Sequence, residues 1–502
     1  MTIATLLQMA TAADPDRLAV GSLSFAELSA RAAAMAGRLR GTGASSLIFT
    51  GVSSEAWPVA LFGCAAAGIP LIPLNYRLSA DQLRALLRRV DRPLVAADPR
   101  YLEVFSGTGV TAVDVHDLTA APPASARDAT LAPELADGGD PDAVAVILFT
   151  SGTTAAPRGV LLRHTNLLSY VVQTVEFASA SPLECALVSV PPYHVAGVGT
   201  VLTNCYAGRR IRYLPDFDPA RWLQVVQDEG VTQAMLVPTM LARIVEQLGT
   251  SPAVTPSLRS IAYGGAAMAP GVLLRALAAF PEVDFVHSYG LTETSSTVAV
   301  LGPAEHRAAA AAADQRVRRR LGSAGRAVPG VQFRVVDARG APLAAGEPGE
   351  LQVRGPQVSG EYLNEASVLD QDGWFATRDR ASLDEDGFLY ILGRLDDTII
   401  RGAENISPAE IEAAVAAHPL VRDVGVVGVP DQEWGQRSVA VVVLAPGASL
   451  TEDELRGWVR ARARGSRTPD EVIFTDVLPY NVMGKLLRRE LLPDRTQKRD
   501  SP

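Results

Sequence analysis

The sequence has 502 residues, of which 48% are hydrophobic and 20% are charged, and its formal net charge is −9. This length exceeds one ordinary hydrophobic core, so two or more packed units are expected. The acidic balance, spread without long charged runs, argues against nucleic acid or an anionic membrane surface as the main partner.

Several features predict a cytoplasmic protein without a membrane span. No uninterrupted apolar run approaches the roughly 20 residues of a transmembrane helix. The first 20 residues lack the basic start and long apolar stretch of a signal peptide. Cys64, Cys185 and Cys205 have apolar neighbours and no C-x-x-C spacing, which predicts reduced core residues and no metal site.

The first half of the chain alternates apolar strands with amphipathic helices. Ser24 and Glu27 form a capping-box pattern before a helix expected at 25–39. Further helices are expected at 55–67, 79–90, 165–177, 196–207, 218–229 and 238–248. Strands are expected at 47–49, 69–74, 144–149, 186–190, 211–214 and 233–237. This alternation predicts α/β sheets, with an exposed connection at 117–142 that is rich in Ala, Pro and Asp.

The pattern changes after Pro329. Residues 331–336 and 349–353 alternate with period two, as in small antiparallel sheets. The last hundred residues predict helices at 408–418 and 451–463 and strands at 424–429, 438–444 and 471–474. We therefore predict a large N-terminal domain (1–395) of α/β sheets plus a small antiparallel barrel-like sheet, and a small α+β C-terminal domain (396–502).

A polar loop follows the strand expected at 144–149. Thr150, Ser151, Thr153 and Thr154 place four hydroxyls within five residues around Gly152, before a Pro-Arg-Gly turn. Backbone N–H groups and hydroxyls in such a loop can bind oxyanions, although Walker A spacing is absent. An ordinary polar turn is the alternative, but a strand followed by T-S-G-T-T and P-R-G is far more specific.

This stretch resembles the T-S-G-[ST]-T-G-x-P-K-G signature of the acyl-adenylate-forming superfamily, which includes acyl-CoA synthetases, firefly luciferase and peptide-synthetase adenylation domains. The resemblance covers essentially the whole chain and is closest to acyl-CoA ligases. It implies that a carboxylic acid attacks the α-phosphorus of ATP with Mg²⁺, and that coenzyme A then attacks the acyl-adenylate (acyl-AMP). It also implies domain alternation, in which the small domain rotates between the two steps.

The heptapeptide His287-Ser288-Tyr289-Gly290-Leu291-Thr292-Glu293 matches the family's Y-G-x-T-E motif. The resemblance implies that Tyr289 stacks on adenine and that Thr292 donates to the phosphates. Glu293 would hold Mg²⁺, which prefers one or two carboxylates plus phosphate oxygens; a solvated surface role for Glu293 is the alternative. Further nucleotide-binding residues implied by the family are Arg158, Gly265, Ala266, Ala267, His287, Ser288, Gly290, Asp379 and Arg394, the last two at the ribose.

The acyl pocket is predicted around the segment P-P-Y-H-V-A-G. The residues assigned to it are His194, Val195, Gly197 and Gly264. A lone histidine is more often a satisfied core residue, but its context favours the pocket here. The glycines in this region predict room for a bulky or cyclic apolar acid.

Three further elements belong to the C-terminal part. Asp396 matches the hinge about which the small domain swings; hinges need few residues. Gly402, Ala403 and Glu404 correspond to the loop that lines the CoA tunnel. Lys485, near the chain end, corresponds to the lysine that bridges the carboxylate and the α-phosphate and stabilises the developing charge.

The chain departs from the family pattern where the triphosphate should bind. Ala155 replaces a glycine, which restricts the backbone. Arg158 replaces a lysine and Arg378 a glycine, and neither change is conservative. One hypothesis is that adenylation is weak or lost, so that CoA thioesterifies an adenylate made by a separate enzyme. The alternatives are an ordinary two-step synthetase, an enzyme that loads an acyl carrier protein, and a non-catalytic sensor. Either a monomer or a homodimer fits.

Overall fold

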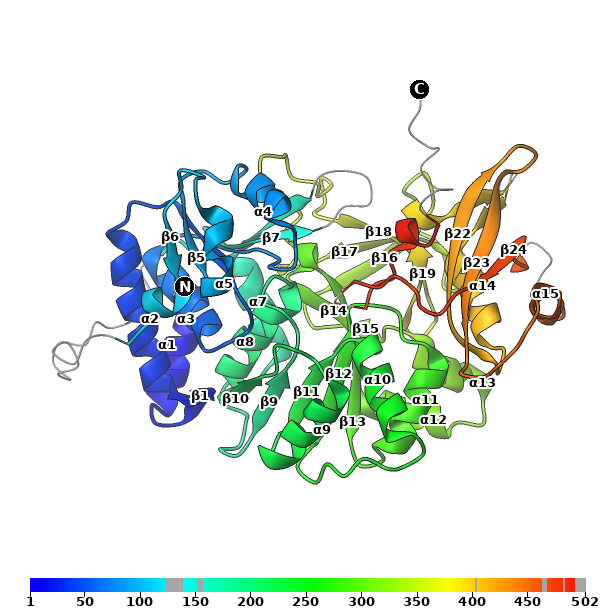
Figure 1. Cartoon of the computed structure of the whole chain (residues 1–502), viewed down its shortest axis with the longest axis horizontal. Helices are drawn as coiled ribbons and strands as arrows, with labels where there is room; N and C mark the ends of the chain where they lie inside the picture. The colour runs from blue at the N-terminus through cyan, green and yellow to red at the C-terminus, as the bar shows by residue number, and fades with distance from the viewer. Residues whose placement is uncertain are drawn as a thin grey trace.

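The protein is described by a computed structural model that covers residues 1–121, 135, 139–150, 157–401, 404–462, 467–481 and 484–492. Two large sheets and a four-stranded sheet form the main body, and a smaller C-terminal unit lies at one end of it (Figure 1). Within these residues, no helix combines the length and apolar character that a membrane crossing requires.

A six-stranded sheet carries the segment before the polar loop. It is parallel through β7, and β8 returns antiparallel with Thr150 opposite Arg158. Thr150 and Arg158, which flank the segment 151–156, are thereby held side by side. The strand order is β6 (Ala112–Asp114), β5 (Pro93–Ala97), β3 (Ser46–Thr50), β4 (Leu71–Pro73), β7 (Val144–Thr150) and β8 (Arg158–Arg163).

A nine-stranded sheet forms the second layer. Its central strands are parallel, and antiparallel pairs close both edges. The order is β15 (Arg326–Ala327), β14 (Ser296–Leu301), β13 (Asp284–Leu291), β12 (Ser260–Gly264), β11 (Gln233–Leu236), β9 (Cys185–Val188), β10 (Arg210–Tyr213), β1 (Leu18–Val20) and β2 (Leu23–Ser24).

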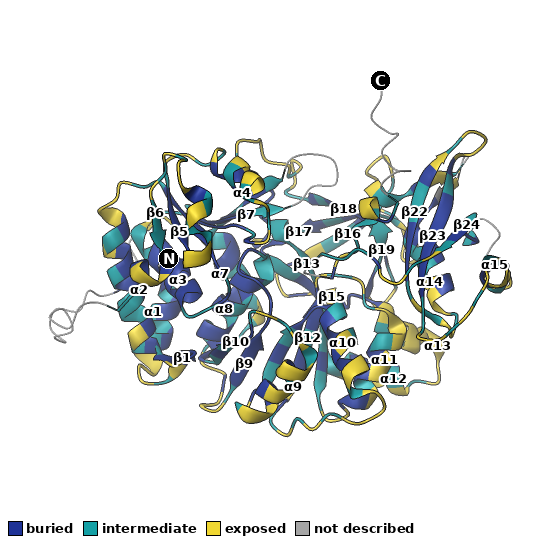
Figure 2. Cartoon of the chain, viewed as in Figure 1, coloured by how far each residue is buried: buried dark blue, intermediate teal, exposed yellow. Residues whose placement is uncertain are grey.

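One apolar core joins these two sheets. It contains Leu47 and Val146 from the six-stranded sheet, Leu187 and Leu236 from the nine-stranded sheet, and Trp57 from a helix between them. Figure 2 shows this dark, buried interior beneath an exposed outer shell. The helices of this part are α1 (Ala4–Ala13), α2 (Phe25–Arg40), α3 (Ala56–Ala67), α4 (Ala80–Leu87), α5 (Pro99–Leu102), α6 (Val115–Leu118), α7 (His164–Thr174), α8 (Val195–Ala207), α9 (Pro219–Asp228), α10 (Pro238–Leu248), α11 (Pro270–Ala279), α12 (Pro303–Ala311) and α13 (Gln315–Arg318).

An antiparallel sheet follows, with β16 (Gln332–Val336), β17 (Gly349–Arg354), β18 (Phe375–Leu383) and β19 (Leu389–Arg394) in that order. The C-terminal unit has its own core around Ile411, Val426, Val442 and Leu455. Its elements are the hairpin β20 (Ile399–Arg401) and β21 (Glu404–Ile406), the sheet β22 (Val421–Asp431), β23 (Gly435–Leu444) and β24 (Glu471–Phe474), and the helices α14 (Pro408–Ala416) and α15 (Glu452–Arg460).

The predicted fold class is confirmed, and so is the local chemistry behind it. Ser24 Oγ accepts from the Glu27 N–H at 3.2 Å, and Glu27 accepts from the Ser24 N–H at 2.9 Å, which is the predicted capping box. The three cysteines are buried and free. The domain boundary after residue 395 stays a prediction.

The element ends differ from the predictions by a few residues, because hydrogen bonding and tertiary contacts set them rather than periodicity. The helix predicted at 79–90 ends at Leu87, and the strand predicted at 424–429 runs over β22. The prediction of an exposed connection at 117–142 is wrong at Leu118, Thr119 and Leu135, which are 8%, 4% and 4% exposed. Most of that connection lies outside the described residues.

Candidate functional site

The Y-G-x-T-E motif occupies the end of β13 and the turn that follows. β12 and β13 are parallel neighbours, with Gly264 opposite Ser288, so their carboxyl ends meet at one edge, where α/β sheets bind ligands. A Cβ on Gly264 would lie 2.1 Å from the Ser288 carbonyl oxygen, and one on Gly290 would lie 1.8 Å from the Ser296 carbonyl oxygen. Only glycine therefore lets these strands approach so closely.

A carboxylate lies buried between two of the predicted nucleotide-binding residues. Asp379, on β18, is 4% exposed and accepts hydrogen bonds from the Tyr289 hydroxyl at 2.5 Å and from Arg394 at 3.0 Å. Burial raises the pKa of Asp379, whereas Arg394, Tyr289 and Lys485 oppose that rise. The site thus holds an oriented acceptor, which suits recognition of vicinal hydroxyls.

A second carboxylate, Glu293, lies near Arg158 of β8. The Tyr362 hydroxyl donates to Glu293 Oε1 at 2.9 Å. The Arg158 guanidinium lies 3.4 Å from the centre of the Tyr362 ring and forms an ion pair with Glu365. Arg158 therefore stays close to the end of β7 and to Glu293. Its hydrogen bond to Glu365 raises the pKa of Arg158 most, and the charge of Glu293 raises it further.

The C-terminal lysine approaches this same site from the small unit. The segment before it returns toward the main body, where it is drawn in red (Figure 1). A Cβ on Gly484 would lie 2.5 Å from Thr239 Oγ1, at the start of α10. The side chain of Lys485 is exposed, and its charge acts on Asp379. Of the 46 lysine and arginine residues in the sequence, only Lys485 and Lys498 are lysines.

The predicted acyl-pocket residues lie at the start of α8. His194 is its N-cap, Val195 its first residue, and a Cβ on Gly197 would lie 2.4 Å from the Pro191 carbonyl oxygen. Within the described part of the chain, His194 Nε2 and the Tyr193 hydroxyl are buried without a hydrogen-bond partner. Burial lowers the pKa of His194 to about 4, so this imidazole is neutral at neutral pH.

Among the other residues of the β12 and β13 motifs, some pack against neighbouring side chains and others are exposed to solvent. The His287 ring stacks on Tyr263 with a centroid distance of 4.8 Å, and its Nδ1 contacts the Ser323 carbonyl oxygen at 2.9 Å. Gly265 has φ +83°, a conformation that favours glycine. The two alanines after it continue the bend; Ala266 is half-buried and Ala267 exposed. Thr292 begins a short 3₁₀ turn.

The predicted hinge is held by an ion pair that the sequence did not reveal. Asp396 pairs with Arg378 at 2.5 Å. Arg378 has φ +62°, a conformation that is uncommon for a residue with a side chain. Glu404, assigned to the CoA tunnel, pairs with Arg467 at 2.6 Å.

Ser151, Gly152, Thr153, Thr154, Ala155, Gly402 and Ala403 lie outside the described residues. Thr150 is described, and its hydroxyl contacts the Arg158 carbonyl oxygen at 3.4 Å.

Sequence reasoning missed Tyr362 and Thr239. Tyr362 connects Glu293 to Arg158, and Thr239 contacts the loop of Lys485. Neither residue stands in a motif that announces its role, because both act through contacts between distant segments. The only available signal for Tyr362 was an aromatic residue two positions after the glycine of a Ser-Gly-Glu-Tyr turn.

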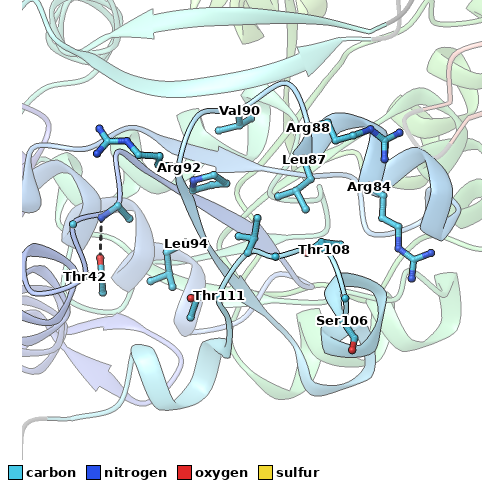
Figure 3. Close-up of a pocket in the computed structure, with 16 residues that line it drawn as sticks. Thr42, Arg84, Leu87, Arg88, Val90, Arg92, Leu94, Ser106, Thr108 and Thr111 are labelled. Carbon is cyan, nitrogen blue, oxygen red and sulfur yellow. Dashed lines mark hydrogen bonds between the residues drawn. The ribbon is translucent and has the colours of Figure 1, made fainter.

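A large open cavity of about 1140 Å³ lies elsewhere, beside α4 and β5 (Figure 3). Arg84, Arg88 and Arg92 border it together with the hydroxyls of Thr108 and Thr111. None of the motif residues lines this cavity, so we do not assign the chemistry to it.

The described residues fit a nucleotide with one metal ion. Asp379 is an oriented, buried acceptor, and Glu293 is a carboxylate that accepts from the Tyr362 hydroxyl near Arg158. No group of three or more His, Cys, Asp or Glu side chains capable of holding a metal occurs among the described residues. A bound ion would therefore take most of its ligands from phosphate and water, as Mg²⁺ does.

Comparisons with known proteins agree with this geometry. Residues 7–363 match the AMP-binding enzyme family, and residues 410–485 match the AMP-binding enzyme C-terminal domain. A feruloyl-CoA synthase from Amycolatopsis is 35% identical over 483 residues, covering 94% of this chain and 93% of the relative. The fatty acid–[acyl-carrier-protein] ligase ScoC from Streptomyces coeruleorubidus is 31% identical over 454 residues, covering 88% and 85%. The structure of o-succinylbenzoate CoA synthetase (MenE) from Bacillus subtilis with its acyl-adenylate has a TM-score of 0.82, 27% identity and 97% coverage of both chains.

Proposed function

The chain belongs to the AMP-binding enzyme family and is an AMP-forming acid–CoA ligase, and we propose that it catalyses both half-reactions on an aromatic or similarly bulky carboxylic acid. One observation carries the proposal: Asp379, Glu293 and Lys485 approach the same sheet edge from three separate parts of the chain. ATP, Mg²⁺ and CoA are the implied ligands.

In the first half-reaction, a carboxylate oxygen of the acid forms a bond to the α-phosphorus of ATP while the bond to pyrophosphate breaks. Asp379 and Arg394 orient the ribose, and Tyr289 supports Asp379 and borders the adenine. Lys485 bridges the carboxylate and the α-phosphate, where a cation stabilises the developing charge. Glu293 would hold Mg²⁺, which would supply positive charge to the phosphates. The protein contributes positioning and electrostatics rather than a covalent intermediate.

In the second half-reaction, the CoA sulfur forms a bond to the acyl carbon, and AMP leaves with the bridging oxygen. For this step we propose that residues 396–502 rotate about Asp396 and bring the segment with Gly402, Ala403 and Glu404 to the site. The domain limits and these roles remain proposals. His194, Val195, Gly197 and Gly264 are assigned to the acyl side of the site.

The hypothesis of weakened adenylation has less support than the complete reaction. Arg158 keeps a cation close to Glu293 and is paired with Glu365, while the Arg378 guanidinium is paired with Asp396. Both departures thus have acidic partners within the protein. The relatives that synthesise CoA thioesters also favour the complete reaction, so we treat thioesterification alone as the competing outcome.

An aromatic acid is favoured by one feature of the site and by one relative. His194 Nε2 is buried without a hydrogen-bond partner among the described residues, and burial lowers the pKa of His194 to about 4. Gly197 and Gly264 do not add room for the acid as expected, because a Cβ on either would meet a backbone carbonyl oxygen. A relative 35% identical is a feruloyl-CoA synthase. Transfer to an acyl carrier protein is the second candidate, because ScoC is 31% identical.

Two assays on the purified chain test the proposal with ferulic acid and a panel of aryl and fatty acids. One measures pyrophosphate release from acid and ATP; the other measures thioester formation from the synthetic acyl-adenylate with CoA or with carrier protein. We expect activity in both assays, with CoA preferred. Activity from the adenylate alone would establish a thioesterification enzyme, and transfer to the carrier alone would replace CoA as the acceptor.

A further inference from the structure

Strand β18 carries two arginines next to the nucleotide site. Thr377 and Asp379 are buried, whereas Arg378 is exposed and Arg380 half-buried. The ladder is irregular here, because Ala376 lies opposite Gln352 and Arg380 opposite Glu350, and Arg378 has φ +62°. Arg378 and Arg380, which we call the β18 arginine pair, form ion pairs with other carboxylates than Asp379.

Both members of the β18 arginine pair contact acidic groups at the start of the small unit. Arg378 pairs with Asp396 at 2.5 Å, and Arg380 pairs with Glu410 of α14 at 3.6 Å. Two other groups face these charges: Glu350 acts on Arg378, and Arg467 also pairs with Glu410. The contacts join the four-stranded sheet to the hinge and to the first helix of the C-terminal unit.

These ion pairs coincide with a particular placement of Lys485. In the same arrangement Gly484 lies against Thr239, and the charge of Lys485 acts on Asp379. This placement matches the role proposed above for Lys485 in the first half-reaction. Rotation of the small unit for the second half-reaction would separate Arg380 from Glu410, because the two residues lie on opposite sides of the hinge.

We propose that Arg378 and Arg380 are positioning residues, whose ion pairs with Asp396 and Glu410 hold the small unit in the orientation that brings Lys485 to the adenylation site. The inference rests on the proposed two-step function but concerns the balance between its steps. The strained backbone of Arg378 is consistent with this role, since strain of this kind is retained where surrounding contacts maintain it.

Because the Arg378 side chain is 59% exposed, salt will screen its ion pair. Exposed ion pairs contribute little each, so together the two pairs bias the orientation by about two- to tenfold. High salt, or loss of both arginines, will therefore lower by that factor the population of the orientation in which Lys485 reaches the adenylation site.

A cross-linking experiment without substrate tests this inference. Thr239→Cys and Gly484→Cys place Cβ atoms about 3.2 Å apart, with Gly484 at φ +68°, so a small backbone shift brings them to the separation of about 3.5–4.5 Å in disulfides; the three native cysteines are buried. We expect the rate of disulfide formation to fall about two- to tenfold between about 0.05 and 1 M NaCl, because the Debye length shortens to about 3 Å at the higher concentration. In the Arg378→Gly, Arg380→Ala background it should be low and insensitive to salt. Arg334→Ala removes an ion pair with Asp370 outside the hinge and should leave the rate unchanged.

Equal rates in all backgrounds would overturn the proposal. A second measurement needs no added cysteine: the ratio of thioester formation from synthetic feruloyl-adenylate and CoA to pyrophosphate exchange with ferulic acid. We expect this ratio to rise in the double arginine variant, and an unchanged ratio counts against the proposal even if cross-linking fails. Because cross-linking uses no substrate, its result is independent of whether CoA is the acceptor.

Discussion

Replacement of Asp379 by Asn tests the nucleotide site directly. The change keeps the size of the side chain but removes the charge that accepts from Tyr289 at 2.5 Å and from Arg394 at 3.0 Å. A hydrogen bond to a charged group contributes about 1.5–3 kcal/mol. Loss of the charged acceptor for the ribose should therefore lower kcat/KM for ATP by roughly 10- to 150-fold.

The effect on stability should be smaller than the effect on ATP. Burial already raises the pKa of Asp379, so desolvation opposes the charged form in the folded protein, and a neutral amide avoids that cost. The Arg394 side chain is also 29% exposed, so water partly compensates it. We expect the free energy of unfolding to fall by only about 1–2 kcal/mol.

The assay is pyrophosphate exchange at varied ATP with ferulic acid, together with urea unfolding. Asp370→Asn is the matched control, because that aspartate belongs to the same region but pairs with Arg334 on the surface, and its kcat/KM for ATP should not change. A folded Asp379→Asn enzyme with kcat/KM within about threefold of wild type would refute the assignment of the ribose site.

Three further predictions follow from single features. An amine-directed reagent should abolish adenylation by modifying Lys485, since Lys498 is the only other lysine. The reagent should inactivate the Lys498→Arg variant equally, and ATP together with the acid should protect the enzyme from inactivation. Gly290→Ala should destabilise the protein by about 2 kcal/mol or more, because its Cβ would lie 1.8 Å from a carbonyl oxygen, whereas Gly457→Ala, in an open helical position, should stabilise by about 0.5–1 kcal/mol in urea unfolding. Burial lowers the pKa of His194 to about 4, so the unfolded chain binds its proton first as pH falls; stability should decline from about pH 6.5 toward 4, and His194→Gln should flatten that decline in urea midpoints.

Each of these has a contrary outcome. Full activity after modification of Lys485, confirmed by mass spectrometry, would exclude its role in adenylation. Equal stability of the Gly290 and Gly457 variants would contradict the close approach of the strands. An unchanged pH profile for His194→Gln would mean that this imidazole is not buried in its neutral form.

Local features of the fold could be predicted from the sequence because short segments determine them. The capping box at Ser24 and Glu27 is an example, since both partners lie within one helical turn. The site was predicted only as a set of motifs. The bond between Tyr289 and Asp379 joins residues 90 positions apart, and no periodicity or spacing reports such a contact.

Arg378 shows the same limit in a different way. From the sequence it was an added charge near the nucleotide. In the structure its backbone has φ +62°, and its guanidinium meets Asp396, 18 positions later. A side chain's direction depends on the backbone conformation at that residue, which a residue's identity does not fix. The prediction that Arg378 harms adenylation therefore depended on the direction of its side chain, which the sequence does not determine.

Nearly all basic residues of this chain are arginines, so the lysine at position 485 is an exception. The ion pairs that join the small unit to the main body use arginine, whose planar guanidinium is suited to paired carboxylates. Lys485 is exposed and close to Asp379, and a compact ammonium concentrates its charge at a point. A group that must reach between a carboxylate and a phosphate, and then withdraw when the small unit moves, benefits from this compactness. The two kinds of cation thus divide the work: arginines set the orientation of the small unit, and one lysine delivers charge to the reacting atoms.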